Sequence, residues 1–211
     1  MNKKHTIVLL LLAVLTFAFA PSDYKLVSNP EVVLKKLKTV ADKTYSISAD
    51  YKEEKQLAAF NKPQVSTGKF YYEKDNKMRW EQVSPFEYII LLNGKSLRIR
   101  DNGKEVKIPA SNKVALKVNE FMMKLIEGDY QSNKDLKTQC FESSTKYLIE
   151  LVPLTKPLSK TYAKLELYFS KKNSRLENIT FYEKGGDKKI VTFTNQIYNP
   201  KVLDGELFLS F

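Results

Sequence analysis

The chain has 211 residues and a mass of 24.4 kDa, which is enough for one sizeable domain. It carries 35 Lys and Arg residues against 24 Asp and Glu, a formal net charge of +11. The only His is His5 and the only Cys is Cys140. This composition excludes a metal site built from several His and Cys ligands, and it excludes an internal disulfide.

The first 20 residues have the layout of a secretory signal peptide. Lys3 and Lys4 make a basic start, residues 7–14 are an unbroken apolar run, and small residues alternate up to Ala20. The apolar stretch is shorter than the roughly 20 residues that a membrane-spanning helix needs. We expect cleavage within a few residues of Ala20, which removes His5 and with it any His-based triad. The alternative is an uncleaved membrane anchor.

The rest, residues 21–211, is expected to form a single domain that begins with a helix. Asn29 is a good N-cap, Pro30 suits the first helical position, and Glu31 places an acid in the first turn. Apolar residues then recur at helical spacing. The pattern predicts a helix over residues 30–42 with one apolar face, formed by Val33, Leu34, Leu37, Val40 and Ala41.

From residue 44 the apolar period changes to two, which is typical of half-buried strands. Strands are predicted over residues 44–52, 68–73, 77–83 and 87–92. Asn93-Gly94 is a strong signal for a hairpin, and Asn102-Gly103 continues the meander through Val106 and Ile108.

A helical insertion is predicted over residues 114–127, closed by Gly128. Its apolar face is wider than a surface helix needs, and Met122 and Met123 suit irregular apolar partners. Beyond it lies Cys140, in an alternating stretch that indicates a half-buried strand. Further strands are predicted over residues 147–152, 163–170, 176–183, 189–197 and 206–211.

Together these elements predict a mainly β (α+β) fold with one antiparallel sheet of about ten strands. Such a sheet curls to bury one face, and the few helices cover that face only in part. An apolar concavity, suited to a ligand, is the expected result.

The stretch of residues 68–97 resembles the signature of the periplasmic outer-membrane lipoprotein carrier proteins, the LolA type. It contains Gly68-Lys69-Phe70-Tyr71-Tyr72, Met78-Arg79-Trp80-Glu81, Pro85 and Ile89-Ile90-Leu91-Leu92-Asn93-Gly94. Leu151-Val152-Pro153 and the Gly185-Gly186 turn are similar to the C-terminal half of the family. The resemblance extends over nearly the whole mature chain.

The resemblance implies an unclosed β-barrel with a helical lid over an apolar cavity. It implies a monomeric periplasmic carrier that takes acylated lipoproteins from an inner-membrane ABC transporter to an outer-membrane acceptor. No cofactor, metal or catalytic activity is expected. The expected cavity residues are Phe70, Tyr72, Met78, Trp80, Ile90, Leu92, Phe169 and Phe193, and the expected lid residues are Leu116, Phe121, Met122, Leu125 and Ile126.

The chain departs from the family at the residue that controls the lid. Many members have Arg-Pro where this chain has Lys74-Asp75, and that Arg holds the lid shut through carbonyls of the lid helices. Lys74 can also donate to carbonyls, but through a compact ammonium group instead of the planar guanidinium group of Arg. Arg79 is a second lid-control candidate, although alternation with Trp80 places it on the opposite face.

Other interpretations stay open at this stage. Trp80 and the aromatic residues of the strands also suit an ordinary core. A barrel of the same fold that senses lipid or lipoprotein in envelope stress is an alternative function. An enzyme on lipid or glycan that uses only acids is a third, although Glu53 and Glu54 are adjacent on a strand and point to opposite faces. Nucleic-acid binding is not expected, because the positive charge is spread and no binding motif is present.

Overall fold

The alternating apolar residues build one large antiparallel sheet. The computed structural model describes residues 23–108, 113–130, 134–200 and 205–211. In this part of the chain the sheet has twelve strands in the order β1-β8-β9-β10-β11-β12-β2-β3-β4-β5-β6-β7. Every neighbouring pair is antiparallel, and β1 and β7 end the sheet without pairing with each other. The predicted mainly β, unclosed architecture is therefore confirmed.

The strands are β1 (Lys25–Leu26), β2 (Ser46–Gln56), β3 (Gln64–Glu73), β4 (Lys77–Ser84), β5 (Tyr88–Asn93), β6 (Ser96–Asp101), β7 (Lys104–Val106), β8 (Leu136–Glu142), β9 (Lys146–Pro153), β10 (Tyr162–Ser170), β11 (Leu176–Glu183) and β12 (Lys188–Tyr198). The helices are α1 (Pro30–Asp42), α2 (Lys113–Ile126), α3 (Leu158–Thr161) and the short 3-10 helix η1 (Gly205–Phe208).

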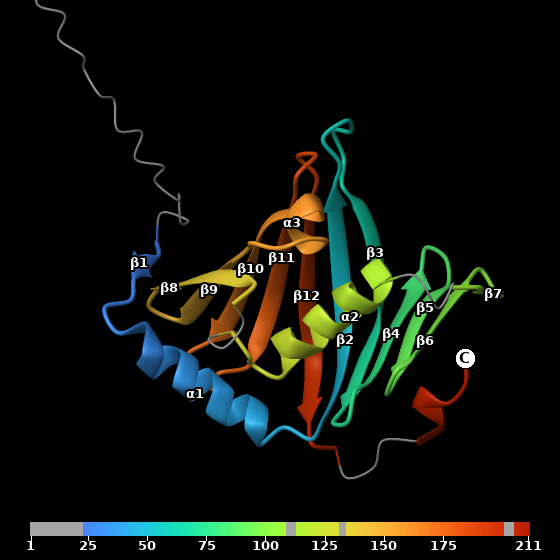
Figure 1. Ribbon diagram of the computed structural model, residues 1–211, viewed down its shortest axis with the longest axis horizontal. Coiled ribbons are helices and arrows are strands. Elements are labelled where there is room, and N and C mark those ends of the chain that lie inside the picture. Colours follow the sequence, from blue (N-terminus) through green and yellow to red (C-terminus); the bar gives the residue numbers. More distant parts are fainter. Residues whose placement is uncertain (1–22, 109–112, 131–133, 201–204) are drawn as a thin grey trace, which may run out of the picture.

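Two helices lie across the concave face of the curled sheet. In Figure 1, α1 runs along the lower edge of the sheet and α2 crosses in front of β12 and β2. The apolar face of α1 is buried through Val33, Leu34 and Leu37, as its spacing predicts. Asn29 occupies the N-cap position, but its side chain makes no capping hydrogen bond. The helix is therefore held mainly by the packing of its apolar face.

The core lies between these helices and the inner face of the sheet. Its most completely buried side chains belong to neighbouring strands on the β9–β12 side, at Ile149, Leu151, Leu165, Leu167 and Val191. Cys140 is also buried, not half-buried, because it faces α1 from β8. Among the described residues, no helix is long and apolar enough to cross a membrane.

The predicted strand over residues 206–211 is wrong. This segment forms η1 and packs on the outer face of the sheet, where Phe208 is buried. The outer side of β5 carries Ile89 and Leu91, and both are buried as well. The 3-10 helix η1 covers these two residues. Because burial of apolar side chains stabilises the fold, the segment forms this compact turn instead of an extra strand.

Candidate functional site

Two cavities lie on the concave face, one on each side of α2. The lower cavity, between α1, α2 and the sheet, measures about 70 Å³ and is lined by Leu37, Val40, Ala41, Thr44, Ile47, Ala49, Phe70, Trp80, Met122, Leu125, Ile126, Tyr130, Phe169, Ser174, Arg175, Leu176, Ile179, Phe193, Gln196 and Tyr198. The upper cavity measures about 430 Å³ and is lined by Tyr51, Glu53, Met78, Trp80, Gln82, Phe86, Tyr88, Ile90, Asp101, Met122, Tyr162, Phe181 and Lys189.

The two cavities differ in what they can hold. Ligand sites typically measure about 300–1,000 Å³, so the upper cavity is already of ligand size. The lower cavity has room for only a few water molecules. Trp80 and Met122 line both cavities.

Trp80 is the centre of an aromatic cluster on the inner face of the sheet. Its ring centroid lies 4.8 Å from Tyr51, 5.4 Å from Phe70 and 6.0 Å from Phe193. These residues come from β2, β3 and β12, which are neighbours in the sheet. Trp80 is only half-buried, so its indole face is available to a ligand.

The structure divides the expected cavity residues into two groups. Phe70, Met78, Trp80, Ile90, Phe169 and Phe193 each line at least one cavity. Tyr72 and Leu92 line neither of the two, and both are buried in the core. Burial and the nearby carboxylates of Glu127 and Asp75 raise the pKa of Tyr72 to about 12, so its hydroxyl stays neutral.

The expected lid residues on α2 also divide. Met122, Leu125 and Ile126 line the lower cavity, and Met122 faces the upper one as well. Phe121 lines neither of them and is buried in the core. The side chain of Leu116 lies outside the described residues. The wide apolar face therefore serves both as core and as cavity wall.

Lys74 connects the β3–β4 turn to the end of α1. Its Nζ donates a hydrogen bond of 2.6 Å to the carbonyl oxygen of Asp42, and it lies 4.1 Å from the Tyr45 ring centroid. The last carbonyls of a helix have no partner within the helix and carry negative partial charge, so an ammonium group there is favourable. Lys74 thus restrains one of the two covering helices.

Arg79 faces away from the cavities. Its Nη1 donates to the carbonyl oxygens of Ser210 at 2.8 Å and Leu207 at 3.3 Å, while Nε pairs with Glu81 at 2.7 Å. Asn93 also donates to the Phe208 carbonyl at 3.2 Å. Arg79 holds the C-terminal segment on the outer face, so the lid-control role expected for it has no structural support.

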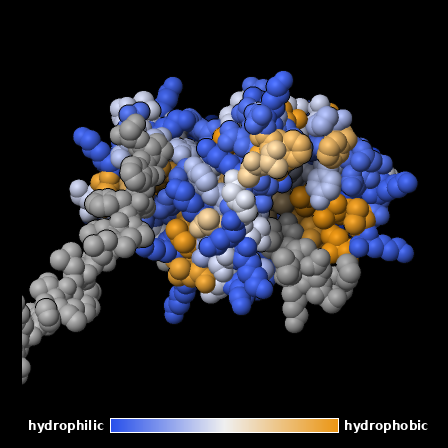
Figure 2. All heavy atoms as spheres, turned by 90° about the horizontal axis from the view of Figure 1, so that it is seen from above, coloured by the Kyte–Doolittle hydropathy of each residue, from blue (hydrophilic) through white to orange (hydrophobic). Residues whose placement is uncertain are grey.

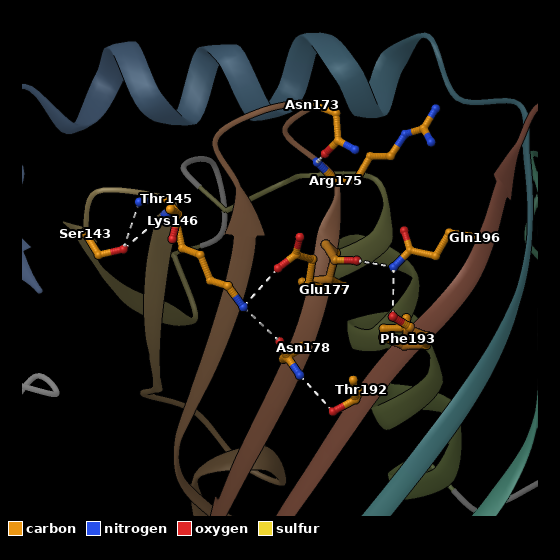
Figure 3. A network of polar contacts seen from close by, with 11 residues as sticks. Ser143, Thr145, Lys146, Asn173, Arg175, Glu177, Asn178, Thr192, Phe193 and Gln196 are labelled. Atoms are coloured by element: carbon orange, nitrogen blue, oxygen red, sulfur yellow. Dashed lines mark hydrogen bonds and ion pairs between the residues drawn. The ribbon is translucent and has the colours of Figure 1, made fainter. Parts of the chain in front are cut away.

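Polar side chains border the lower cavity beneath α1, and Figure 3 shows this region. The pairing of β12 with β2 has a register irregularity between Thr194 and Ile197, and Gln196 lies within it. The side-chain amide of Gln196 donates to the Leu176 carbonyl at 2.7 Å. Nearby, the Arg175 guanidinium stacks 4.1 Å from the ring centroid of Tyr198. The border of this cavity is thus polar while its wall is apolar.

Sequence reasoning missed three kinds of cavity residue. It assigned Leu37 and Val40 of α1 only to a helix face, although they line the lower cavity. Tyr51 alternates in step with Ala49 along the same strand, and this alternation was the signal that could have placed Tyr51 on the inner face. Lys189, which pairs with Glu53 at 3.9 Å in the upper cavity, gave no such signal, because its partner lies on a distant stretch of the chain.

The acids that line the upper cavity come from distant strands. Glu53 is on β2 and Asp101 is on β6, which are four inter-strand steps apart in the sheet order. Among the described residues, no group of three or more potential metal ligands was found.

An unclosed antiparallel barrel whose helices cover apolar cavities defines a class of binding proteins. The family model described as "Outer membrane lipoprotein carrier protein LolA" matches residues 42–209. This match covers most of the chain, and the protein therefore belongs to the LolA family. No curated protein matches the chain in sequence.

Solved structures with a similar fold include several that are distant in sequence. An uncharacterised conserved protein from Thermus thermophilus has 12% identity and a TM-score of 0.50, with 86% of this chain and 93% of that chain covered. A LolA superfamily protein from Nitrosomonas europaea has 12% identity and a TM-score of 0.44, with 84% and 96% covered. The lipoprotein LppX of Mycobacterium tuberculosis has 8% identity and a TM-score of 0.46, with 83% and 99% covered.

Proposed function

We propose that the protein is an exported, monomeric carrier that binds the acyl chains of lipoproteins in its cavities and ferries them from the inner to the outer membrane. Its partners are acylated lipoproteins, an inner-membrane ABC lipoprotein transporter and an outer-membrane acceptor. The observation that carries this proposal is the pair of apolar cavities that share Trp80 and Met122, in a chain of the LolA family.

The physics of acyl chains explains why such a cavity is needed. Each methylene group left in water costs about 0.8 kcal/mol, so one long acyl chain costs roughly 12 kcal/mol. An apolar cavity removes this cost while the cargo crosses an aqueous compartment. Release then requires a second state with lower affinity, and movement of the covering helices provides it. The role of α2 as the movable lid is part of the proposal.

The proposed loading step joins the two cavities. In the closed state Met122 lies between them, and Leu125 and Ile126 line the lower one. When α2 moves outward, an acyl chain that has entered the upper cavity extends past Trp80 into the lower cavity. The aromatic cluster around Trp80 becomes the central wall of the enlarged site.

Binding is measured through Trp80, the only Trp in the chain. The mature protein is titrated with a triacylated lipopeptide and, in parallel, with the same peptide without acyl chains. We expect the acylated peptide alone to change the Trp80 emission in a saturable way. An equal response to both peptides, or no response to either, would contradict acyl binding.

Met122→Glu is expected to weaken acyl binding about 100-fold or more, because a carboxylate would stand between the chain and Trp80. Phe121→Glu is unsuitable for this test, since Phe121 is part of the core and the variant is expected to unfold. Lys117→Gln is the matched control, because Lys117 is exposed on the same helix and its loss changes the net charge equally. Unchanged acyl binding in a folded Met122→Glu variant would contradict the assignment of α2 as the lid.

Lys74→Met tests the restraint on α1. Cys140 is buried in β8 beneath α1, and burial raises the pKa of its thiol to about 11, so labelling by thiol reagents requires α1 to detach. Loss of the hydrogen bond to Asp42 is expected to speed the labelling about fivefold. Lys95→Met, in an exposed turn, serves as the control. Equal labelling rates in both variants would show that Lys74 does not hold the helix.

A further inference from the structure

Exposed hydrophobic side chains gather on the loops at one end of the molecule. These loops are residues 57–63, 83–87, 154–161 and 184–187, which together we name the open rim. Phe60, Val83, Phe86 and Leu154 belong to it, and half or more of each side chain is exposed. Figure 2 looks onto this end and shows hydrophobic residues beside a hollow in a largely hydrophilic surface. Phe86 also lines the upper cavity, so that cavity reaches the open rim.

Lysines outnumber acids on the open rim. Lys62, Lys156, Lys160 and Lys184 are exposed, whereas the acids of these ranges are half-buried. One exposed acid, Asp101, lies beside the rim and lines the upper cavity with Phe86. The two acids within the ranges already have partners. Glu87 accepts two hydrogen bonds from Arg100, at 2.7 and 2.8 Å, and Asp187 accepts one from the Ala58 backbone N–H at 2.9 Å. The lysines are therefore available for an anionic partner.

The open rim combines exposed hydrophobic side chains with lysines, and this combination suits one kind of partner surface. Single exposed hydrophobic residues are normal on proteins, but several on adjacent loops with cations between them mark an interaction site. In a lipid bilayer the headgroup region accepts aromatic side chains, and anionic headgroups attract nearby Lys by about 1 kcal/mol each, or about fivefold in affinity. A soluble anion would use the lysines only and would leave Phe60 and Phe86 in water.

We propose that the open rim docks on the surface of an anionic lipid bilayer. Phe60 and Phe86 enter the headgroup region, and the four lysines lie at the level of the phosphates. Because Phe86 lines the upper cavity, docking turns the mouth of that cavity toward the acyl layer. An acyl chain then passes between membrane and cavity without contact with water. Docking itself does not depend on the cargo, whereas this consequence rests on the proposed carrier function.

The test is co-sedimentation of the mature protein with vesicles of phosphatidylcholine, with and without phosphatidylglycerol. We expect at least tenfold stronger binding to the anionic vesicles, weakened by added salt because the lysines are exposed. Phe60→Asp/Leu154→Asp, at two rim residues that line neither cavity, is expected to weaken this binding about tenfold or more. The matched control is Val32→Asp/Ile197→Asp, since both residues are equally exposed outside the open rim and the net charge changes equally.

Three outcomes would overturn the docking proposal. The first is absence of binding to anionic vesicles, and the second is an equal loss in the two double variants, which would make net charge the only cause. The third is binding to native membranes but not to protein-free vesicles, which would assign the open rim to a membrane protein. Acyl binding measured through Trp80 in the same variants keeps the two proposals apart, because it is expected to stay unchanged.

Discussion

Replacing Gly68 with Ala is expected to lower the free energy of unfolding by about 3 kcal/mol or more, through overpacking against rigid backbone. A Cβ atom at Gly68 would lie 1.9 Å from the Glu81 carbonyl oxygen and 2.8 Å from its carbonyl carbon. These atoms belong to β4, which is paired on its other side with β5 and cannot withdraw freely. In a domain of this size we expect the melting temperature to fall by about 6–12 °C.

The close approach at Gly68 has a clear origin. Thr67 pairs with Ser84 but Gly68 pairs with Gln82, so Val83 is the extra residue of a β-bulge in β4. Gly185→Ala is the control, because nothing lies within 4 Å of a Cβ there and the residue is exposed in a turn. Its effect is expected to stay within about 0.5 kcal/mol. Equal melting temperatures of the two variants would show that β4 relaxes at no cost.

Replacing Lys164 with Met is expected to cost about 3–5 kcal/mol at neutral pH, the usual effect of breaking a buried ion pair. On the outer face of the sheet, Lys164 Nζ donates to Glu150 at 2.8 Å and to Glu166 at 2.7 Å. The two carboxylates are only 5% and 2% exposed. The hydroxyls of Tyr168 and Tyr182 donate to Glu166 as well, but they carry no charge that could replace the ammonium group.

The pH dependence of Lys164→Met gives a second check. Burial favours the neutral form of Glu166, but the hydrogen bonds from Lys164 and Tyr168 and the charge of Lys164 outweigh it, so the pKa of Glu166 lies below its usual value. This carboxylate therefore stabilises the native fold fully above about pH 4.3, the unfolded pKa, and the contribution is lost as pH falls through the lower folded pKa.

Without Lys164, burial is no longer outweighed and the pKa of Glu166 is expected to rise. The folded variant then favours the protonated acid, so the stability difference between wild type and variant should narrow from pH 7 to pH 4. Lys52→Met is the control, since Lys52 and Glu54 form an exposed pair worth less than about 1 kcal/mol. Chemical denaturation at both pH values measures these differences. A stability difference between wild type and Lys164→Met that stays constant with pH would contradict the proposed ion cluster.

Local sequence patterns predicted most of the secondary structure, because the periods of strands and helices are properties of short segments. Pro30 and the apolar spacing after it placed α1 over Pro30–Asp42, and alternation placed β11 over Leu176–Glu183. The resemblance in residues 68–97 predicted the family, which the match over residues 42–209 shows. The short strand β1 and the helix α3 were not predicted, because two to four residues hold no measurable period.

Alternation along the strands predicted a mainly β sheet and the inner face that carries Phe70 and Trp80, because it decides which side chains share a face. The unclosed barrel was predicted from the resemblance to the LolA type. The packing of the helices on the sheet separates the apolar residues into core and cavity wall. Phe121 and Met122 are neighbours in sequence, yet Phe121 lies in the core and Met122 lies between the cavities. Likewise, Lys74 and Arg79 both donate to carbonyls, but their acceptors are 32 and 128 or more residues away in the chain. Such partners depend on where whole elements pack, and no local pattern encodes that position.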